Sequence, residues 1–250
     1  MTLYLVSSVV VFVFSGVLSM AGLGAAFLFV PFFFYLGVPL PEATSTALLL
    51  NAVSLSFAAF TYWRADLIDW RVGLPVAVTA VALAPLGARA TPYVDTSVLL
   101  ALFAAFLVFA GAMMLFFKPK PRAHEMSGAV EAGVGAGVGG VAGYLGGLLG
   151  VGGGNFILPV FNWLGLDAKV AAGTTAVVVV FASLSGFLGH ASMGGLDPAF
   201  IGVTATAAAG GSLVGAHFMK TKLSSVQLKR IIGVLLWLIA LKMIFDLVTK

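Results

Sequence analysis

Long runs of apolar residues without a single charge recur along this chain. One of them extends from residue 96 to residue 117, longer than the roughly 18 residues that mark a membrane-spanning helix. Inside a bilayer every backbone N–H and C=O must find a partner within the protein, so only helices and closed barrels can span it. The strand-length segments of alternating polarity that a barrel needs do not occur. The chain is therefore predicted to be an all-α polytopic membrane protein, with the lipid bilayer as its surroundings.

Composition supports this class and excludes several kinds of function. Only 9% of the 250 residues are charged, against roughly 25% in soluble domains. The chain has no cysteine, which excludes disulfides, thiolate metal sites and cysteine nucleophiles. Its net charge of +4 lies in short connections, so it indicates membrane topology rather than a nucleic-acid surface. We expect neither a metal nor a cofactor.

Two clusters of glycine interrupt the apolar runs, and they lie at matching places in the two halves of the chain. The offset is 128 residues, and the matched pairs include Gly22 and Gly150, Gly24 and Gly152, Pro31 and Pro159, and Asp69 and Asp197. Chance would not readily place these residues in one register in so apolar a chain. We therefore predict an internal repeat, with residues 1–117 and 128–250 as the repeats and 118–127 as a charged linker.

Each glycine break is followed by an apolar segment of about a dozen residues, too short to cross a core of about 30 Å at 1.5 Å per residue. We predict two such half-helices, Ala25–Leu36 and Gly153–Leu164, and expect Pro39 and Pro41 to end the first because proline cannot continue the hydrogen-bond ladder. The predicted full spans are Leu3–Met20, Ala43–Trp63, Trp70–Ala90, Thr96–Phe117, Gly128–Leu149, Lys169–His190, Pro198–Phe218 and Lys229–Val248.

Positive charge predicts how the two repeats are oriented, because cytoplasmic loops carry the excess of Lys and Arg. With the linker 118–127 inside, the basic turn at residues 64–71 is also inside, while its uncharged counterpart at 191–196 is outside. The basic segment 220–230 is inside, and its counterpart near Tyr93 is outside. The repeats are therefore predicted to be inverted, each with about four full spans and one broken or re-entrant half-helix. Secondary transporters commonly have this arrangement, with the binding site at the glycine-interrupted segments.

A helix that begins inside the membrane presents unpaired N–H groups and the positive end of its dipole, which favour an anion. Glycine lets an anion approach the backbone closely, and hydroxyls and amides would complete the pocket. The spans have no acidic residue at their middle, which disfavours a cation site. Glycines spaced by four in residues 133–147 are instead assigned to helix packing. The predicted substrate-binding residues are Gly24, Thr46, Asn51, Gly152, Gly153, Gly154, Asn155, Thr174 and Thr175.

Three further polar residues allow more than one interpretation. His190, equivalent to Tyr62, is a candidate for proton coupling because histidine titrates near neutrality, or else an interfacial side chain. Arg89 and His217 occupy equivalent positions, and the sequence leaves open whether they face the pathway. Ser185 and His190 invite an intramembrane serine hydrolase. However, five residues on a helix place them about 140° apart beyond a full turn, so an enzyme is not expected.

The two glycine breaks, with Gly22-x-Gly24 before Pro31 and Gly150-x-Gly152-Gly153-Gly154-Asn155 before Pro159, resemble those of the sulfite exporter TauE/SafE family, also called toluenesulfonate uptake permeases. The first break departs from the family's glycine run at Ala25 and Ala26. The resemblance implies a transporter of small sulfur-containing anions, such as sulfite or organosulfonates, in the cytoplasmic membrane of a prokaryote. An anion channel on the same scaffold is the alternative.

Overall fold

The structure is a computed structural model that describes residues 2–116, 128–190, 198–221 and 225–248. All regular elements within these ranges are helical and none is a strand, which confirms the predicted all-α class. The helices are α1 (Thr2–Ser19), α2 (Ala26–Tyr35), α3 (Leu40–Trp63), α4 (Trp70–Ala90), the short 3-10 helix η1 (Thr91–Tyr93), α5 (Thr96–Phe116), α6 (Gly128–Leu149), α7 (Gly154–Trp163), α8 (Ala168–His190), α9 (Pro198–Thr221) and α10 (Ser225–Val248).

Six helices in the described part of the chain are long and apolar enough to cross a bilayer, which makes this a multi-pass membrane protein. They are formed by α3, by α4 together with η1, and by α5, α6, α8 and α9. The two predicted half-helices also form, and α2 and α7 have 10 residues each. The predicted linker 118–127 and the turn 191–196 lie outside the described residues, so the repeat boundaries and the inverted orientation stay predictions.

The half-helices end differently from the sequence expectation. Gly37, with φ of +89°, follows the end of α2, and the N–H of Val38 donates to the carbonyl of Phe33 at 3.1 Å. A left-handed glycine with this bond is a Schellman ending. The expectation that Pro39 and Pro41 end the half-helix is therefore wrong: both precede or begin α3, where proline is favoured because the first helical N–H groups have no acceptor.

The second half-helix ends in the same way. Gly165 has φ of +96°, and the N–H of Leu166 donates to the carbonyl of Phe161 at 3.0 Å. Pro31 and Pro159 both lie inside their half-helices rather than at the ends. Equivalent backbone bonds thus close both half-helices.

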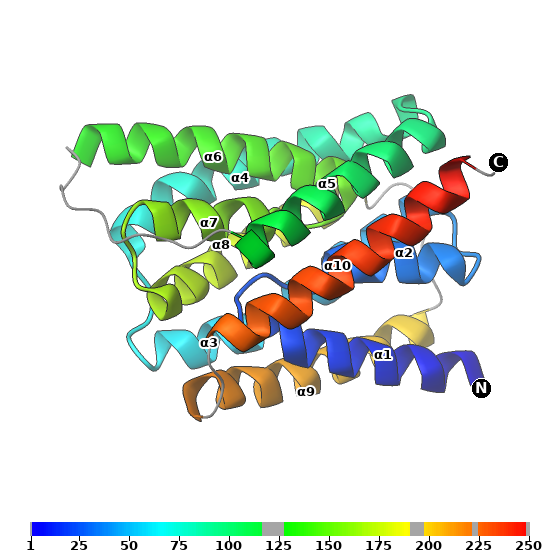
Figure 1. Cartoon of the computed structure of the whole chain (residues 1–250), viewed down its shortest axis with the longest axis horizontal. Helices are drawn as coiled ribbons and strands as arrows, with labels where there is room; N and C mark the ends of the chain where they lie inside the picture. Colours follow the sequence, from blue (N-terminus) through cyan, green and yellow to red (C-terminus); the bar gives the residue numbers. More distant parts are fainter. Residues whose placement is uncertain (1, 117–127, 191–197, 222–224, 249–250) are drawn as a thin grey trace.

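Helices of one half pack on helices of the other. In Figure 1, α1 runs beside α9, and α6 runs beside α4, which are equivalent pairs under the 128-residue offset. Helices α5 and α10 lie side by side across the front of the same view, and α3 packs on α8. Each half therefore completes the packing of the other.

Glycines permit the close approach of α6 to α4, as predicted. A Cβ added at Gly143 would lie 2.6 Å from Cα of Ala80, and one at Gly147 would overlap the carbonyl oxygen of Ala84. Gly133 and Gly137, assigned to packing in the same series, have nothing within 4 Å of the added Cβ. The packing assignment thus holds for the later glycines of the series and fails for these two, because their positions on the helix face away from α4.

Two buried side chains make equivalent bonds at the ends of α3 and α8. The hydroxyl of Tyr62 donates to the carbonyl of Ser19 at 2.6 Å. His190 Nε2 lies 3.0 Å from the carbonyl oxygen of Gly147, so this nitrogen carries the donated hydrogen. Each bond fixes the last turn of α1 or α6 just before a glycine break.

Candidate functional site

The two glycine breaks meet at one asparagine. Gly24 and Gly152 have φ values of +70° and +72°, a left-handed conformation that glycine adopts without the penalty of a Cβ. An added Cβ at Gly24 would overlap Oδ1 of Asn51, and one at Gly152 would lie 2.7 Å from Nδ2 of the same side chain. Both turns thus present bare backbone to Asn51, which brings the starts of α2 and α7 together.

Asn51 bridges three elements from the middle of α3. Its Oδ1 accepts a hydrogen bond of 3.3 Å from the N–H of Ala26, the first residue of α2. Its Nδ2 donates to Oγ of Ser183 on α8 at 2.9 Å. Asn51 and Ser183 are both 0% exposed. The asparagine therefore caps one half-helix and links the two central helices, which explains how the bundle accommodates a buried amide.

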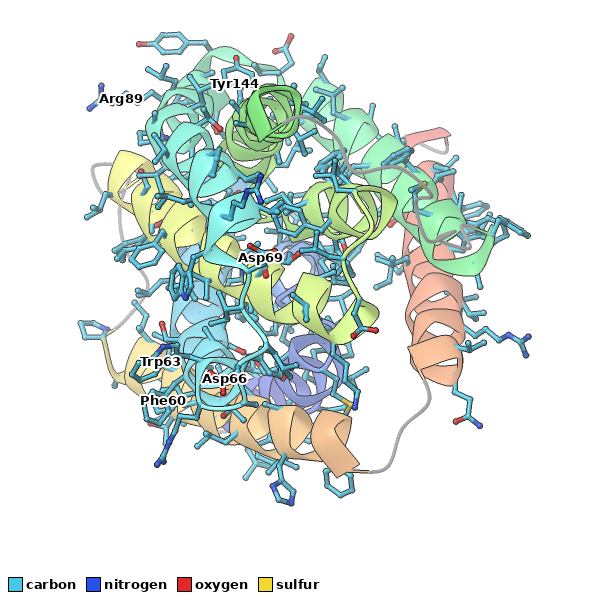
Figure 2. The ribbon with its side chains drawn as sticks, turned by 90° about the vertical axis from the view of Figure 1, so that its left-hand side faces the viewer. Phe60, Trp63, Asp66, Asp69, Arg89 and Tyr144 are labelled. Carbon is cyan, nitrogen blue, oxygen red and sulfur yellow. The ribbon has the colours of Figure 1, made fainter. Side chains whose placement is uncertain are left out.

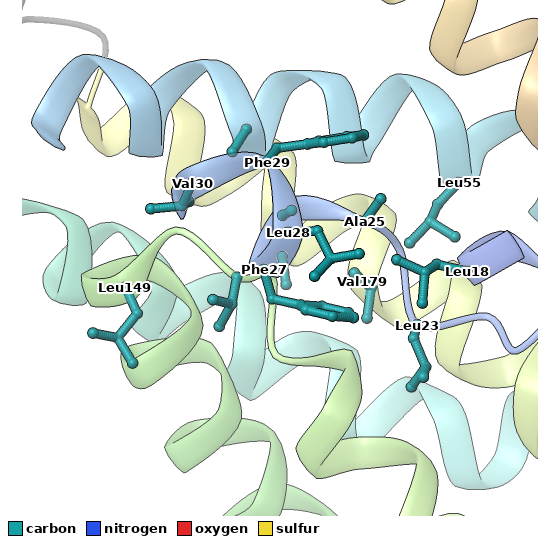
Figure 3. Packing of buried hydrophobic residues seen from close by; sticks show 14 of the residues in the cluster. Leu18, Leu23, Ala25, Phe27, Leu28, Phe29, Val30, Leu55, Leu149 and Val179 are labelled. Carbon is teal, nitrogen blue, oxygen red and sulfur yellow. The ribbon is translucent and has the colours of Figure 1, made fainter. Parts of the chain in front are cut away.

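Apolar side chains enclose this polar group. Figure 3 shows Leu18, Leu23, Leu55 and Val179 around the chain that leads into α2, and all four are buried. Val179 is the repeat counterpart of Asn51, and its Cγ1 would lie 3.1 Å from a Cβ at Gly152. Gly24, Gly152, Gly153 and Gly154 are buried as well. In this conformation the glycine turns around Asn51 are therefore closed to solvent.

The backbone at the start of α7 repeats that of α2, where the carbonyl of Ala25 accepts from the N–H groups of Leu28 and Phe29 at 2.9 and 3.0 Å. The two starts differ at Asn51, which caps α2 and is Val179 in the second half. The carbonyl of Gly153 accepts from the N–H groups of Phe156 and Ile157 at 3.0 and 3.3 Å, so the N–H groups of Gly154 and Asn155 have no acceptor within the helix. Oδ1 of Asn155 and Oγ1 of Thr175 are buried without a hydrogen-bond partner in the part of the chain that the structure describes.

The other predicted threonines lie elsewhere. Oγ1 of Thr174 accepts from the N–H of Asp69 at 2.9 Å, at the N-cap of α4. Thr174 also lines an apolar hollow of about 370 Å³ with Trp70 and Phe181. A second hollow of about 440 Å³ shares Trp70 and Phe181 and adds Trp63. Thr174 thus belongs to the flank of the bundle, although its backbone lies next to Thr175. Thr46 is 3% exposed and lies five residues before Asn51 on α3, so the two side chains point about 140° apart.

Charged and titratable residues are not part of the Asn51 cluster. Figure 2 shows Arg89 extending away from the helices, and both Arg89 and His217 are exposed. The hydroxyl of Ser185 donates to the carbonyl of Val81 at 2.7 Å, while His190 is bonded to Gly147. Ser185 therefore donates to a backbone carbonyl and not to His190, so the two residues do not form the serine–base pair of a hydrolase. Within the described ranges, no group of three or more His, Asp or Glu side chains could hold a metal ion.

The contribution of Ser183 is absent from the sequence prediction. Its repeat counterpart is Leu55, so comparing the two halves gives no signal for it. A small hydroxyl in a spanning helix is also commonly bonded to its own helix. Only the crossing of α3 and α8 shows that this serine faces Asn51.

Comparison with known proteins identifies a family. The family model described as Sulfite exporter TauE/SafE matches residues 8–243, which include both glycine breaks, Asn51 and Ser183. No curated protein and no solved structure matches the chain.

Proposed function

Because the chain belongs to the sulfite exporter TauE/SafE family, we propose that it is a secondary permease that binds a small sulfur oxyanion or organosulfonate between the starts of α2 and α7. The membrane is the cytoplasmic membrane of a prokaryote. The binding residues are Gly24, Asn51, Gly152–Gly154 and Asn155, with Thr175 on α8, which packs on α7.

One observation carries this proposal: two half-helix starts converge on a single buried amide. Helix N-termini attract anions through their free N–H groups and their dipoles. Here the left-handed turns at Gly24 and Gly152 pack so closely on one asparagine that a Cβ added at either glycine would meet its amide. A glycine turn before a half-helix, repeated in both halves, is the arrangement that transporters use at the bilayer midplane.

Asn51 has two tasks in this mechanism. Its carbonyl oxygen holds the first N–H of α2, and its amide N–H groups are the donors available to an anion. Anion binding would exchange the bond to Ser183 for a charge-assisted bond, which is about twice as strong as a neutral one. Because α3 and α8 cross at this bond, its exchange couples occupancy of the site to the packing of the two halves.

The proposal is tested by flux in liposomes. Asn51→Val copies the residue at the equivalent position of the second half, Val179, and removes both bonds. We expect uptake of sulfite to fall about tenfold or more, the factor given by losing at least one hydrogen bond to a charged ligand. Thr61→Val is the matched control, because this exposed hydroxyl on α3 bonds only Phe57 of its own helix.

Concentration dependence separates the transporter from an anion channel. A permease that binds its substrate in a closed site gives saturable flux that excludes chloride. Flux that rises linearly with concentration and admits chloride would establish the channel instead. Equal flux in Asn51→Val and wild type, with both proteins folded, would remove the Asn51 site.

A further inference from the structure

Two buried polar groups beside the start of α7 have no partner among the described residues. They are Oδ1 of Asn155 and Oγ1 of Thr175, in side chains 1% and 0% exposed. Asn155 is in the first turn of α7. Thr175 is on α8 one turn before Val179, whose Cγ2 would lie 3.1 Å from a Cβ at Gly154. Since α7 and α8 are consecutive and pack on each other, Thr175 lies along α7 about one helical turn from the level of Gly154.

The repeat supplies an internal control for these two positions. Their counterparts in the first half are Phe27 and Ala47, both 0% exposed. The equivalent positions of the first half therefore carry buried apolar side chains. A buried polar group without a partner costs stability and needs an explanation. Packing does not provide one here, because the first half is built without these polar groups.

The first half has its own polar group where the second has none. Asn51 caps α2, while its counterpart at the start of α7 is Val179. The start of α2 is thus occupied by a side chain, and the start of α7 retains its N–H groups and two unpaired oxygens. The N-terminal ends of α2 and α7 are therefore not equivalent, and the one at α7 has polar groups that can still form hydrogen bonds with a ligand.

We propose that Asn155 and Thr175 select the substrate, by accepting a hydrogen bond from an oxyanion that carries its own proton, such as hydrogensulfite. This inference rests on the proposed permease function. The N–H groups of α7 bind the negative charge, whereas Oδ1 of Asn155 is an acceptor only. A sulfonate group or a fully deprotonated oxyanion offers that oxygen nothing but lone pairs, so Asn155 disfavours both. Thr175 adds to this selection where its hydroxyl, which can also donate, acts as the acceptor.

Two monoanions of similar size test the selection. Hydrogensulfite has a hydroxyl form that donates, and methanesulfonate has no donor. The two anions are compared below and above neutral pH. Hydrogensulfite loses its proton and becomes sulfite across that interval, whereas methanesulfonate stays a monoanion. Binding is measured as thermal stabilisation of the purified protein, and transport as flux in liposomes. The variants are Asn155→Leu and Thr175→Ala, and Ser185→Ala on α8 is the control, since its hydroxyl bonds Val81.

We expect hydrogensulfite to bind about tenfold to a hundredfold more tightly than methanesulfonate, and Asn155→Leu to abolish that preference. Thr175→Ala is expected to reduce it while leaving the melting temperature without ligand unchanged or raised. Equal binding of both anions, or a preference that survives in both variants, overturns the inference but leaves the permease intact. A melting temperature that falls in Thr175→Ala without ligand assigns a packing role and also overturns it. If no sulfur anion binds or crosses the membrane, the proposed function fails and the inference fails with it.

Discussion

Replacing Gly24 by alanine should destabilise the protein far more than the added methyl group suggests. The left-handed φ of +70° costs an alanine roughly 1–2 kcal/mol. The new Cβ would also overlap Oδ1 of Asn51, so the asparagine must leave its place. That breaks the bonds to Ala26 and Ser183, each worth about 1 kcal/mol, and leaves a buried amide unpaired. The total loss in the free energy of unfolding is about 3–5 kcal/mol by these terms.

Gly37→Ala provides a matched control for this loss. Gly37 has φ of +89°, so alanine has the same backbone penalty, but nothing lies within 4 Å of the added Cβ. Unfolding of both variants would be followed in mixed micelles by titration with SDS. The difference between them measures the displacement of Asn51 alone, which we expect to be about 2–3 kcal/mol. If the two variants lose equal stability, Gly24 does not support Asn51 and the convergence at the site is wrong.

Two other predictions use the same unfolding assay. Gly143→Ala should lower the free energy of unfolding by about 1–3 kcal/mol because the methyl group meets backbone atoms of Ala80. Gly137→Ala should raise it by up to about 1 kcal/mol, because alanine has the higher helix propensity and its methyl group meets nothing there. The opposite pair of signs would refute the packing of α6 on α4. Tyr62→Phe should cost about 1 kcal/mol, because the buried carbonyl of Ser19 loses the tyrosine donor but keeps the N–H of Gly22 at 3.0 Å. An unchanged value would mean that the bond from Gly22 alone satisfies this carbonyl.

The sequence predicts the helices well because the bilayer restricts the chain so strongly. The predicted span at Trp70–Ala90 is found with those bounds in α4, since Asp69 caps it with bonds of 2.9 and 3.3 Å to the first N–H groups. The C-terminal ends of helices that stop at a left-handed glycine are harder to predict from the sequence. Gly37 ends α2, but the prolines that follow it are the stronger local signal, and they belong to the next helix.

The site was predictable in its residue types and not in its contacts. Asn51 is conspicuous because an amide in a spanning segment needs a partner. That partner, Ser183, is 132 positions away and has an apolar repeat counterpart. Thr174 and Thr175 look interchangeable in sequence. One turns toward Asp69 and the other is buried unpaired, because adjacent residues on a helix point about 100° apart.

The crossed pairing of helices has a consequence for how the protein is made. Helix α1 leaves the ribosome long before the helix on which it packs, α9, which begins at Pro198. The newly inserted N-terminal half therefore has to wait in the bilayer with the close-packing surface around Gly16 uncovered, until Gly211 and Gly215 arrive to meet it. Translation pauses or premature stops in that interval produce an incomplete protein with exposed contact faces, the kind of intermediate that membrane chaperones and proteases recognise. Two separately synthesised halves should still associate in the membrane, because helices of each half pack against helices of the other.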